Sequence, residues 1–481
     1  MSGEKQVREP RMPKLWEALL TMLFLVVMLA IGIIVYGVDP HVPMFVGVIG
    51  AALMALYLGY KWEAIEKSMM NGIYKALQSI VILTIIGILI GVWIDAGVVP
   101  SMIYYGLKIL HPSIFFIAAM LICSITSLAT GTSWGTMGTM GVALMGIGMG
   151  LGMNPAMTAG AIISGAYFGD KMSPLSDTTN LAPAMAGTDV MTHVKFMILP
   201  TAIAYGVTLV VFGVLGFTQY HGGDADLSQV QVLSDALSGL FNVNPILLLP
   251  PVIVIVAVAC KIPAIPGITL GIIAGGVCGL VFQPECSLGT LFSCGINGYE
   301  CLTGVESIDD LLSSGGLLGM MFSVSMTIIA MMFGGIMEDT HQLEVIVNKL
   351  KSLARNPASL VTLTEVTCVI SNATMPEQYI SIVVPGRMYA EEYRKMGLHP
   401  KTLSNALEGA GTVTSALIPW NTCGVFIVST LGITTAQYAP YAVFNWLMPI
   451  VVIVMAFMGL TTADADGVRL AKKKGAAPVA K

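Results

Sequence analysis

Apolar blocks long enough to cross a lipid bilayer recur along this 481-residue chain. A transmembrane helix needs about 20 apolar residues, and the clearest blocks of that kind lie at 15–37, 42–60, 73–95, 192–218, 245–261, 264–283, 315–337 and 440–460. Charged residues make up 11% of the chain, against about 25% in soluble domains. The first block is longer than the apolar core of a signal peptide, which has about 7–15 residues, and we interpret it as a retained helix. The sequence therefore predicts an all-α polytopic membrane protein.

The basic residues indicate how this chain is oriented, because Lys and Arg favour the cytoplasmic ends of short loops. With a cytoplasmic N-terminus, all Lys and Arg but Lys108 and Lys171 fall in cytoplasmic segments, which are 5–14, 61–75, 195, 261, 349–355, 387–401 and 469–481. We therefore expect a multi-pass protein of the cell (inner) membrane with both termini cytoplasmic, whose surroundings are the lipid bilayer. The net charge of −5 is segregated by topology and does not indicate nucleic-acid binding.

The two halves of the chain resemble each other in order. Pro112 pairs with Pro357, Cys123 with Cys368, and each half has an amphipathic segment followed by a short apolar arm. The amphipathic segments are 98–110 and 341–355, and the arms are 113–128 and 358–371. Arms shorter than the roughly 17–25 residues of a span predict re-entrant hairpins, at 112–152 and 357–386.

Counting the remaining spans gives the fold. Five spans in each half invert the second half relative to the first, which the distribution of Lys and Arg also requires. The sequence predicts two inverted repeats of five transmembrane helices, each with a re-entrant hairpin and a discontinuous helix, a pattern typical of secondary transporters. The predicted parts are a cytoplasmic N-terminus (1–14), a first repeat (15–218), an extracytoplasmic loop (219–244), a second repeat (245–460) and a basic cytoplasmic tail (461–481).

Four segments place polar residues at membrane depth, at 129–136, 169–180, 371–378 and 409–424. Non-helical backbone is tolerated there only where protein buries it or where it lines a wet cavity. Freed carbonyls and Ser, Thr or Asn oxygens suit a hard cation such as Na⁺, and half-helix N-termini suit an anion. The broken segments are therefore the predicted site.

Asp170, Asp177, Glu377 and Glu408 are the acids of this zone. An ionised carboxylate in a membrane segment costs at least about 2.5 kcal/mol, which marks a functional candidate. A carboxyl group without its water holds its proton more tightly, so that protons and Na⁺ can compete for it. That competition is a sufficient physical basis for Na⁺/H⁺ exchange.

Each acid also has a structural interpretation. Asp170 can pair with Lys171 or cap the helix at the break, and Asp177 can be the N-cap of the second half-helix instead of a ligand. Glu365, in the middle of an arm, is expected to hydrogen-bond a neighbouring helix. The candidate ion- and substrate-binding residues are Asp170, Lys171, Ser173, Ser176, Asp177, Thr178, Asn180, Thr132, Ser133, Asn372, Thr374, Glu377, Glu408, Thr412, Asn421 and Thr422. The predicted Na⁺ ligands among them are Asp177, Thr178, Asn180, Thr132, Thr412 and Asn421.

The broken segments resemble those of the NhaC-type Na⁺/H⁺ antiporter family, within a wider ion-transporter superfamily. The resemblance covers roughly 15–460 and is densest in GTSWGTMGT, GAIISGAYFGDKMSPLSDTTNLAPAMAGTD, QYISIVVPGRMY and GTVTSALIPWNTCG. It implies a homodimer with elevator-like motion, and a site in which one set of residues faces another. The first set is Asp170, Ser176, Asp177, Thr178 and Asn180, and the second is Glu377, Thr412, Asn421 and Thr422.

The leading hypothesis is a secondary active transporter that exchanges Na⁺ or Li⁺ for protons by alternating access. The alternative is a Na⁺-linked exchanger of an organic acid or amino acid, of malate/lactate or arginine/ornithine type, in which Lys171 can pair with a substrate carboxylate. An ion channel is disfavoured because channels line pores with rings of like residues, whereas the polar clusters here are internal and paired. An intramembrane aspartyl protease is disfavoured because its signature has a glycine two residues before Gly169, where this chain has Tyr167. We expect no enzyme activity, no cofactor and no metal site other than for transported Na⁺. Cys286, Cys294 and Cys301 share a predicted outer loop and can form one disulfide.

Overall fold

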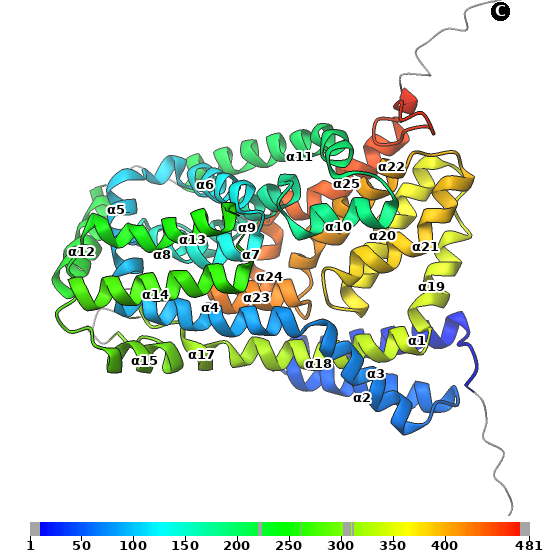
Figure 1. Cartoon of the computed structure of the whole chain (residues 1–481), viewed down its shortest axis with the longest axis horizontal. Helices are drawn as coiled ribbons and strands as arrows, with labels where there is room; N and C mark the ends of the chain where they lie inside the picture. The colour runs from blue at the N-terminus through cyan, green and yellow to red at the C-terminus, as the bar shows by residue number, and fades with distance from the viewer. Residues whose placement is uncertain (1–9, 220–223, 261, 302–308, 310–311, 472–481) are drawn as a thin grey trace, which may run out of the picture.

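The computed structural model describes residues 10–219, 224–260, 262–301, 309 and 312–471, which form helices and turns but no β-strand (Figure 1). Isolated β-bridges pair Leu398 with Asp464 and Ala463 with Arg469. The described ends of the chain lie toward the same end of the molecule, on the right of Figure 1. Parts of the two predicted cytoplasmic termini, 1–9 and 472–481, lie outside the described residues.

Apolar helices form at all of the blocks that the sequence indicated. They are α1 (Leu15–Ala30), α2 (His41–Tyr57), α4 (Leu77–Asp95), α11 (Val190–Gln219), α13 (Leu249–Ala259), α14 (Ala264–Phe282), α18 (Met321–Asp339) and α25 (Val443–Phe457). Among the described residues, 6 helices are long and apolar enough to cross a membrane, or up to 9 if each bent pair counts as one span. The prediction of an all-helical polytopic membrane protein is confirmed; five spans in each half stay a prediction.

A small separate core joins α1, α2, α18 and α3 (Trp62–Lys75). Leu25, Met44, Ile65 and Phe333 are all buried in it. A Cβ on Gly335 would lie 2.1 Å from the Ser68 carbonyl oxygen, so only glycine lets α18 approach α3 this closely. The larger core contains buried apolar residues of the remaining membrane helices.

The two apolar arms are longer than the sequence indicated. The first is helical over Pro112–Thr130, 19 residues that include α6 (Phe115–Thr130), and the second is α20 (Pro357–Thr374), of 18 residues. Their last hydroxyls donate hydrogen bonds within the helix, Thr130 to the Thr126 carbonyl and Thr374 to the Ile370 carbonyl, both at 2.8 Å. The prediction of an arm too short to span was wrong for the first arm, because Ser and Thr satisfied in this way continue a helix. Helix α20 is not among the described helices that are long and apolar enough to cross a membrane, so a re-entrant second arm stays a prediction.

Each arm ends in a break and a second helix. Gly131, with φ +70°, ends α6, and the chain returns through α7 (Ser133–Thr136), a π-helical turn (Met137–Gly141) and α8 (Val142–Gly150). After α20 the chain turns before entering α21 (Ile380–Lys395). The two helix–break–helix units lie where hairpins were predicted, although the arm before the first break is long and apolar enough to span.

Both predicted discontinuous helices are present. Helix α9 (Pro155–Met172) ends before a turn that leads into α10 (Asp177–Ala186). The second comprises α22 (Pro400–Ala406), a π-helical segment η5 (Leu407–Thr412), a 3₁₀ segment η6 (Val413–Leu417) and α23 (Thr422–Leu431). Its two parts are bent by 47° at the break.

The amphipathic segments form helices at opposite ends of the molecule. Helix α5 (Val98–Ile109) lies at the left end of Figure 1, and α19 (Gln342–Lys351) lies at the right end. An inverted repeat would place them so, and the repeat itself stays a prediction. The predicted outer loop at 219–244 contains a helix, α12 (Asp224–Leu240).

The cysteine prediction is not supported. Cys286 and Cys294 are free thiols. Because any pair among Cys286, Cys294 and Cys301 includes at least one of these two, no disulfide joins the three. The Cys286 thiol lies 3.6 Å from the Asp95 carboxylate.

Candidate functional site

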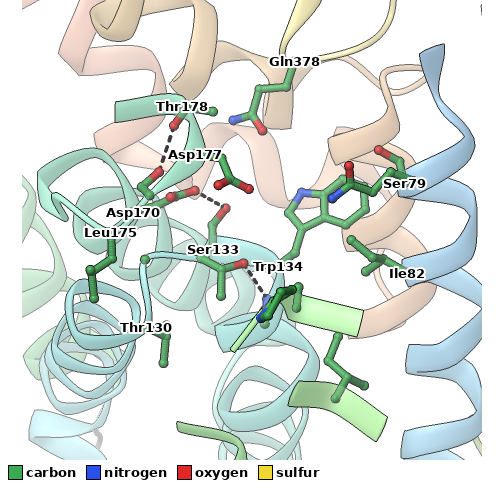
Figure 2. Close-up of a pocket in the computed structure, with 18 of the residues that line it drawn as sticks. Ser79, Ile82, Thr130, Ser133, Trp134, Asp170, Leu175, Asp177, Thr178 and Gln378 are labelled. Atoms are coloured by element: carbon green, nitrogen blue, oxygen red, sulfur yellow. Dashed lines mark hydrogen bonds between the residues drawn. The ribbon is translucent and has the colours of Figure 1, made fainter. Parts of the chain in front are cut away.

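A cavity of about 570 Å³ lies between the break that follows α6, the break between α9 and α10, and the turn that follows α20. Polar residues reach it from four places (Figure 2). They are Thr132 and Ser133 at the first hairpin tip, Asp170, Ser176, Asp177, Thr178 and Asn180 at the α9–α10 break, Glu377, Gln378 and Tyr379 after α20, and Gln78 and Ser79 on α4. The carboxylates of Asp170, Asp177 and Glu377 make the cavity acidic.

Glycines bring α9 against α6 and thereby position Asp170. A Cβ on Gly165 would lie 2.2 Å from the Met120 carbonyl oxygen, and one on Gly169 would lie 2.5 Å from that of Ser124. Asp170 follows directly, is 5% exposed, and accepts a hydrogen bond from the Ser133 hydroxyl at 2.7 Å. The hairpin tip and the break are thus joined by the carboxylate itself.

The structure does not pair Asp170 with Lys171. Consecutive helical residues do not face each other, and Lys171 does not line the cavity whereas Asp170 does. Its ammonium lies 3.6 Å from the Met197 thioether and interacts electrostatically with Glu408 and Glu365. Lys171 is therefore outside the cavity lining, and a substrate in the cavity does not meet it.

Asp177 is not the N-cap of the second half-helix. Ser176 occupies the N-cap position of α10, and Asp177 is the first helical residue. Its carboxylate accepts a hydrogen bond from the Tyr379 hydroxyl at 3.5 Å and is exposed to the cavity. Because a 3.5 Å contact is weak, Asp177 retains most of its capacity to bind a cation.

Several predicted residues stabilise the breaks. The Ser173 hydroxyl donates to the Leu128 carbonyl at 2.8 Å, and the Asn180 amide donates to the carbonyls of Pro174 and Ser176. Thr132 is the N-cap of α7 and accepts from the Gly135 N–H at 3.2 Å. Thr132 and Asn180 also line the cavity, whereas Ser173 does not.

In the second half, Glu377 reaches the cavity while capping a helix. One of its oxygens accepts from the backbone N–H groups of Tyr379 at 2.7 Å and Ile380 at 3.3 Å. An ionised carboxylate is stabilised by such donors at a helix N-terminus. Glu377 therefore holds the start of α21 in place and contributes negative charge to the cavity.

The remaining residues of the second half lie behind the cavity. Asn372 and Asn421 hydrogen-bond each other at 3.1 Å, and Asn421 also accepts from the Cys423 N–H as the N-cap of α23. The Thr374 and Thr422 hydroxyls bond within their own segments, and the Thr412 hydroxyl is buried without a partner. The structure does not bring Asn372, Thr374, Thr412, Asn421 and Thr422 to the cavity surface. Of the two sets of residues predicted to face each other, the cavity is lined by the whole set from the α9–α10 break but only by Glu377 from the other set.

Glu408 also lies outside the cavity, behind Thr178. The Thr178 hydroxyl, which lines the cavity, donates to Glu408 at 3.3 Å and lies 3.1 Å from the Ser176 hydroxyl. Glu365, expected to hydrogen-bond a neighbouring helix, has no hydrogen-bond partner at either carboxyl oxygen. That expectation was wrong.

The candidate residues did not include the cavity residues Gln78, Ser79, Gln378 and Tyr379, of which Gln378 lies within the predicted segment 371–378. Gln78 and Ser79 are an adjacent polar pair within the apolar block 73–95, which is the signal that could have found them. Trp134 lines the cavity as well and stacks on Phe426 with ring centroids 4.5 Å apart. Among the described residues, no group of three or more His, Cys, Asp and Glu is placed to hold a metal ion.

Comparison with known proteins identifies the family. A sequence model described as the Na⁺/H⁺ antiporter family matches residues 165–460. The chain is 37% identical to the Na⁺/H⁺ antiporter NhaC of Alkalihalophilus pseudofirmus, over 95% of this chain and 98% of that protein. The chain belongs to the Na⁺/H⁺ antiporter family. It is accordingly a multi-pass membrane transporter, and the family is not one of enzymes.

Similar proteins are named for the exchange of other solutes. The chain is 37% identical to the malate-2H⁺/Na⁺-lactate antiporter of Bacillus subtilis, over 92% of this chain and 93% of that protein. It is 35% identical to the arginine/ornithine antiporter ArcD of Halobacterium salinarum, over 93% of this chain and 92% of that protein. Membership in the family therefore fixes antiport and leaves the exchanged solute to the site.

Proposed function

We propose that this chain exchanges Na⁺ or Li⁺ for protons by alternating access, as a secondary active transporter. The observation that carries the proposal is the cavity at the helix breaks, with the carboxylates of Asp170, Asp177 and Glu377 around it. Carboxylate and hydroxyl oxygens suit a hard cation, and Ser133, Ser176 and Thr178 supply hydroxyls beside them. The cation binds between Asp170 and Asp177.

The lining charges disfavour an organic anion. Three carboxylates repel a dicarboxylate such as malate, and Lys171, the cation that could attract one, does not line the cavity and is 0% exposed. A substrate anion would have to enter a cavity that is itself negatively charged and whose described lining residues offer no cation to pair with it. Such an arrangement is unfavourable in a low-dielectric site.

The cavity volume favours a second candidate, the Na⁺-linked exchange of an amino acid with a cationic side chain. At about 570 Å³ it falls within the range of about 300–1,000 Å³ typical of small-molecule sites and is larger than Na⁺ alone requires. A guanidinium or ammonium group would suit the acidic lining. This candidate extends the arginine/ornithine alternative, whereas among the described residues the cavity lining contains no Lys or Arg to pair with malate or lactate.

The proposal includes the orientation and the motion. The cavity reaches the first turn of α4 and the connection between α13 and α14 through Ser79, Pro263 and Ala264. With both termini cytoplasmic, these are the cytoplasmic ends of those helices, so the cavity belongs to an inward-facing state in the inner membrane. Elevator-like motion and a homodimer are proposed on the pattern of the family.

Proteoliposomes that contain the purified protein and a pH-sensitive dye test the function. With an imposed pH gradient, addition of Na⁺ or Li⁺ alone should move protons, saturably with ion concentration. The absence of proton movement with either ion would contradict Na⁺/H⁺ antiport. Proton movement that requires arginine or another organic solute besides Na⁺ would favour the second candidate.

A further inference from the structure

Three charged residues form a buried cluster behind the cavity. Lys171, Glu365 and Glu408, hereafter the charged cluster, come from α9, α20 and η5. Lys171 and Glu408 are 0% exposed and Glu365 is 1% exposed, and Lys171 interacts electrostatically with both carboxylates. None of the three lines the cavity, so the cation site does not account for them.

Glu365 is the least satisfied member of the cluster. Neither of its carboxyl oxygens has a hydrogen-bond partner. It lies against the π-helical segment, where a Cβ on Gly409 would be 2.9 Å from Oε1 of Glu365. The titratable groups facing it are Lys171 on α9 and Tyr393 on α21, with Cys368 on its own helix, and Glu408 on η5 shares Lys171 with it.

The charges of the cluster do not balance when both acids are ionised. One ammonium balances one carboxylate, and Glu408 also receives the hydrogen bond from Thr178. An ionised Glu365 would then be a buried charge without a donor, which is far more costly than a buried neutral acid. The cluster is therefore neutral when Glu365 carries one proton.

The cluster is connected to the cation site in two ways. The last turn of α9 presents Asp170 to the cavity and Lys171 to the cluster, so that both charges move with one helix end. The Ser176 and Thr178 hydroxyls, 3.1 Å apart, line the cavity, and Thr178 donates to Glu408. Hydroxyl groups thus bridge the cavity and the charged cluster.

We propose that Glu365 carries the transported proton, in a charged cluster with Lys171 and Glu408 that is separate from the cation site. Na⁺ entering the cavity beside Asp170 adds one positive charge, and Glu365 releases one proton, so the summed charge of the two sites is unchanged. Release of Na⁺ on the other side restores the proton to Glu365. The coupling is electrostatic, and no group has to bind both ions. This inference rests on the proposed Na⁺/H⁺ exchange.

Two transport assays on Glu365→Gln in proteoliposomes test the assignment. The first measures Na⁺-driven proton movement, and the second measures exchange of ²²Na⁺ for Na⁺ at equal pH on both sides. We expect Glu365→Gln to lose Na⁺-driven proton movement and to retain Na⁺/Na⁺ exchange, now independent of pH. Glu338→Gln is the matched control, because Glu338 is an acid on α18 that pairs with Lys75 away from the cluster, and it should keep both activities.

The outcomes separate this inference from the function on which it rests. A wild-type protein without Na⁺-driven proton movement would overturn the proposed function. With an active wild type, coupled proton movement in Glu365→Gln at the wild-type pH profile would overturn the assignment of Glu365. The assignment of Glu365 would also be overturned if Glu365→Gln lost both activities while its thermal unfolding midpoint equalled that of the wild type.

Glu365→Asp covers the case in which the glutamine variant does not fold. It keeps a carboxyl group but shifts it by one methylene relative to Lys171. Coupled exchange should persist with its pH profile displaced from that of the wild type. An unchanged pH profile would overturn the proposal.

Discussion

Asp170 and Asp177 lie in one cavity but are held differently. Asp170 is buried and fixed by the Ser133 hydroxyl at 2.7 Å, whereas Asp177 is exposed and accepts only a long hydrogen bond, from the Tyr379 hydroxyl at 3.5 Å. The first carboxylate is positioned by the protein, and the second is available to an incoming ion. Asp177 is therefore the residue whose charge should govern cation affinity.

Asp177→Asn should weaken Na⁺ binding much more than it destabilises the protein. We expect the apparent KM for Na⁺ to rise by about tenfold or more, which corresponds to about 1.4 kcal/mol. The lost charge at the start of α10 should cost only about 0.3–1 kcal/mol of stability. Saturation curves of Na⁺-driven proton movement and thermal unfolding measure the two effects.

Asp189→Asn is the control for this variant. Asp189 likewise lies at the start of a helix, directly before α11, and accepts from the Thr192 N–H at 2.9 Å, but it lies outside the cavity lining. Its apparent KM should remain that of the wild type. Equal KM values for Asp177→Asn and the wild type would contradict a ligand role for Asp177.

The sequence predicted part of the site at this scale. It placed Asp170, Ser176, Asp177, Thr178 and Glu377 together because helix breaks and charges at membrane depth are visible in a pattern. It could not tell which side of a helix end each residue faces. Lys171 follows Asp170 in the chain, yet the two charges serve different sites.

At the scale of elements, the contact between α6 and α9 holds the break against the hairpin tip. Gly165 and Gly169 sit directly against the backbone of α6, so the two helices touch without intervening side chains. This contact fixes where α9 ends and hence where Asp170 and Lys171 diverge. A small change at the contact should therefore affect stability and transport together.

Gly165→Ala should be destabilising. The added Cβ would lie 2.2 Å from the Met120 carbonyl oxygen, and forcing the helices apart should cost about 1–3 kcal/mol. Gly206→Ala is the matched control, since no atom lies within 4 Å of its added Cβ, and it should be neutral or slightly stabilising. Thermal unfolding in detergent compares the two, and similar midpoints would contradict the packing argument.

The elements themselves were largely predictable. Apolar blocks gave the membrane helices, and clustered Gly, Pro and Ser gave both breaks. The arms were predicted too short, because Thr130 and Thr374 look like the start of a polar loop although their hydroxyls bond inside the helix. Hydropathy alone does not reveal such bonds.

At the scale of the whole molecule, α5 and α19 lie at opposite ends and touch helices from the other part of the chain. Helix α19 packs against α1, and α5 packs against the 3₁₀ turn at Pro245–Leu248 that leads into α13. In an elevator-like transporter these contacts lie where a moving unit meets a static one. A crosslink across either contact should therefore block the elevator-like motion.

A disulfide between engineered cysteines on α19 and α1 should abolish transport, and reduction should restore it. The same holds for a disulfide between α5 and the turn at Pro245–Leu248. A disulfide placed between α13 and α14, which pack as one pair, is the control and should leave transport intact. Full activity with either of the first two disulfides formed would contradict motion at these contacts.

The sequence predicted the membrane class and an orientation, because charge and hydropathy act over the whole chain. It could not predict the second, buried charged site, because Glu365, Glu408 and Lys171 come from three separate helices and meet only in the fold.

The most direct test of the account is the apparent KM for Na⁺ measured at a series of pH values, in proteoliposomes without any organic solute. Na⁺ and protons exclude each other through charge, so KM should rise as the pH falls on the side where Na⁺ enters, while the maximal rate at saturating Na⁺ is maintained. A KM for Na⁺ that is independent of pH would contradict the account.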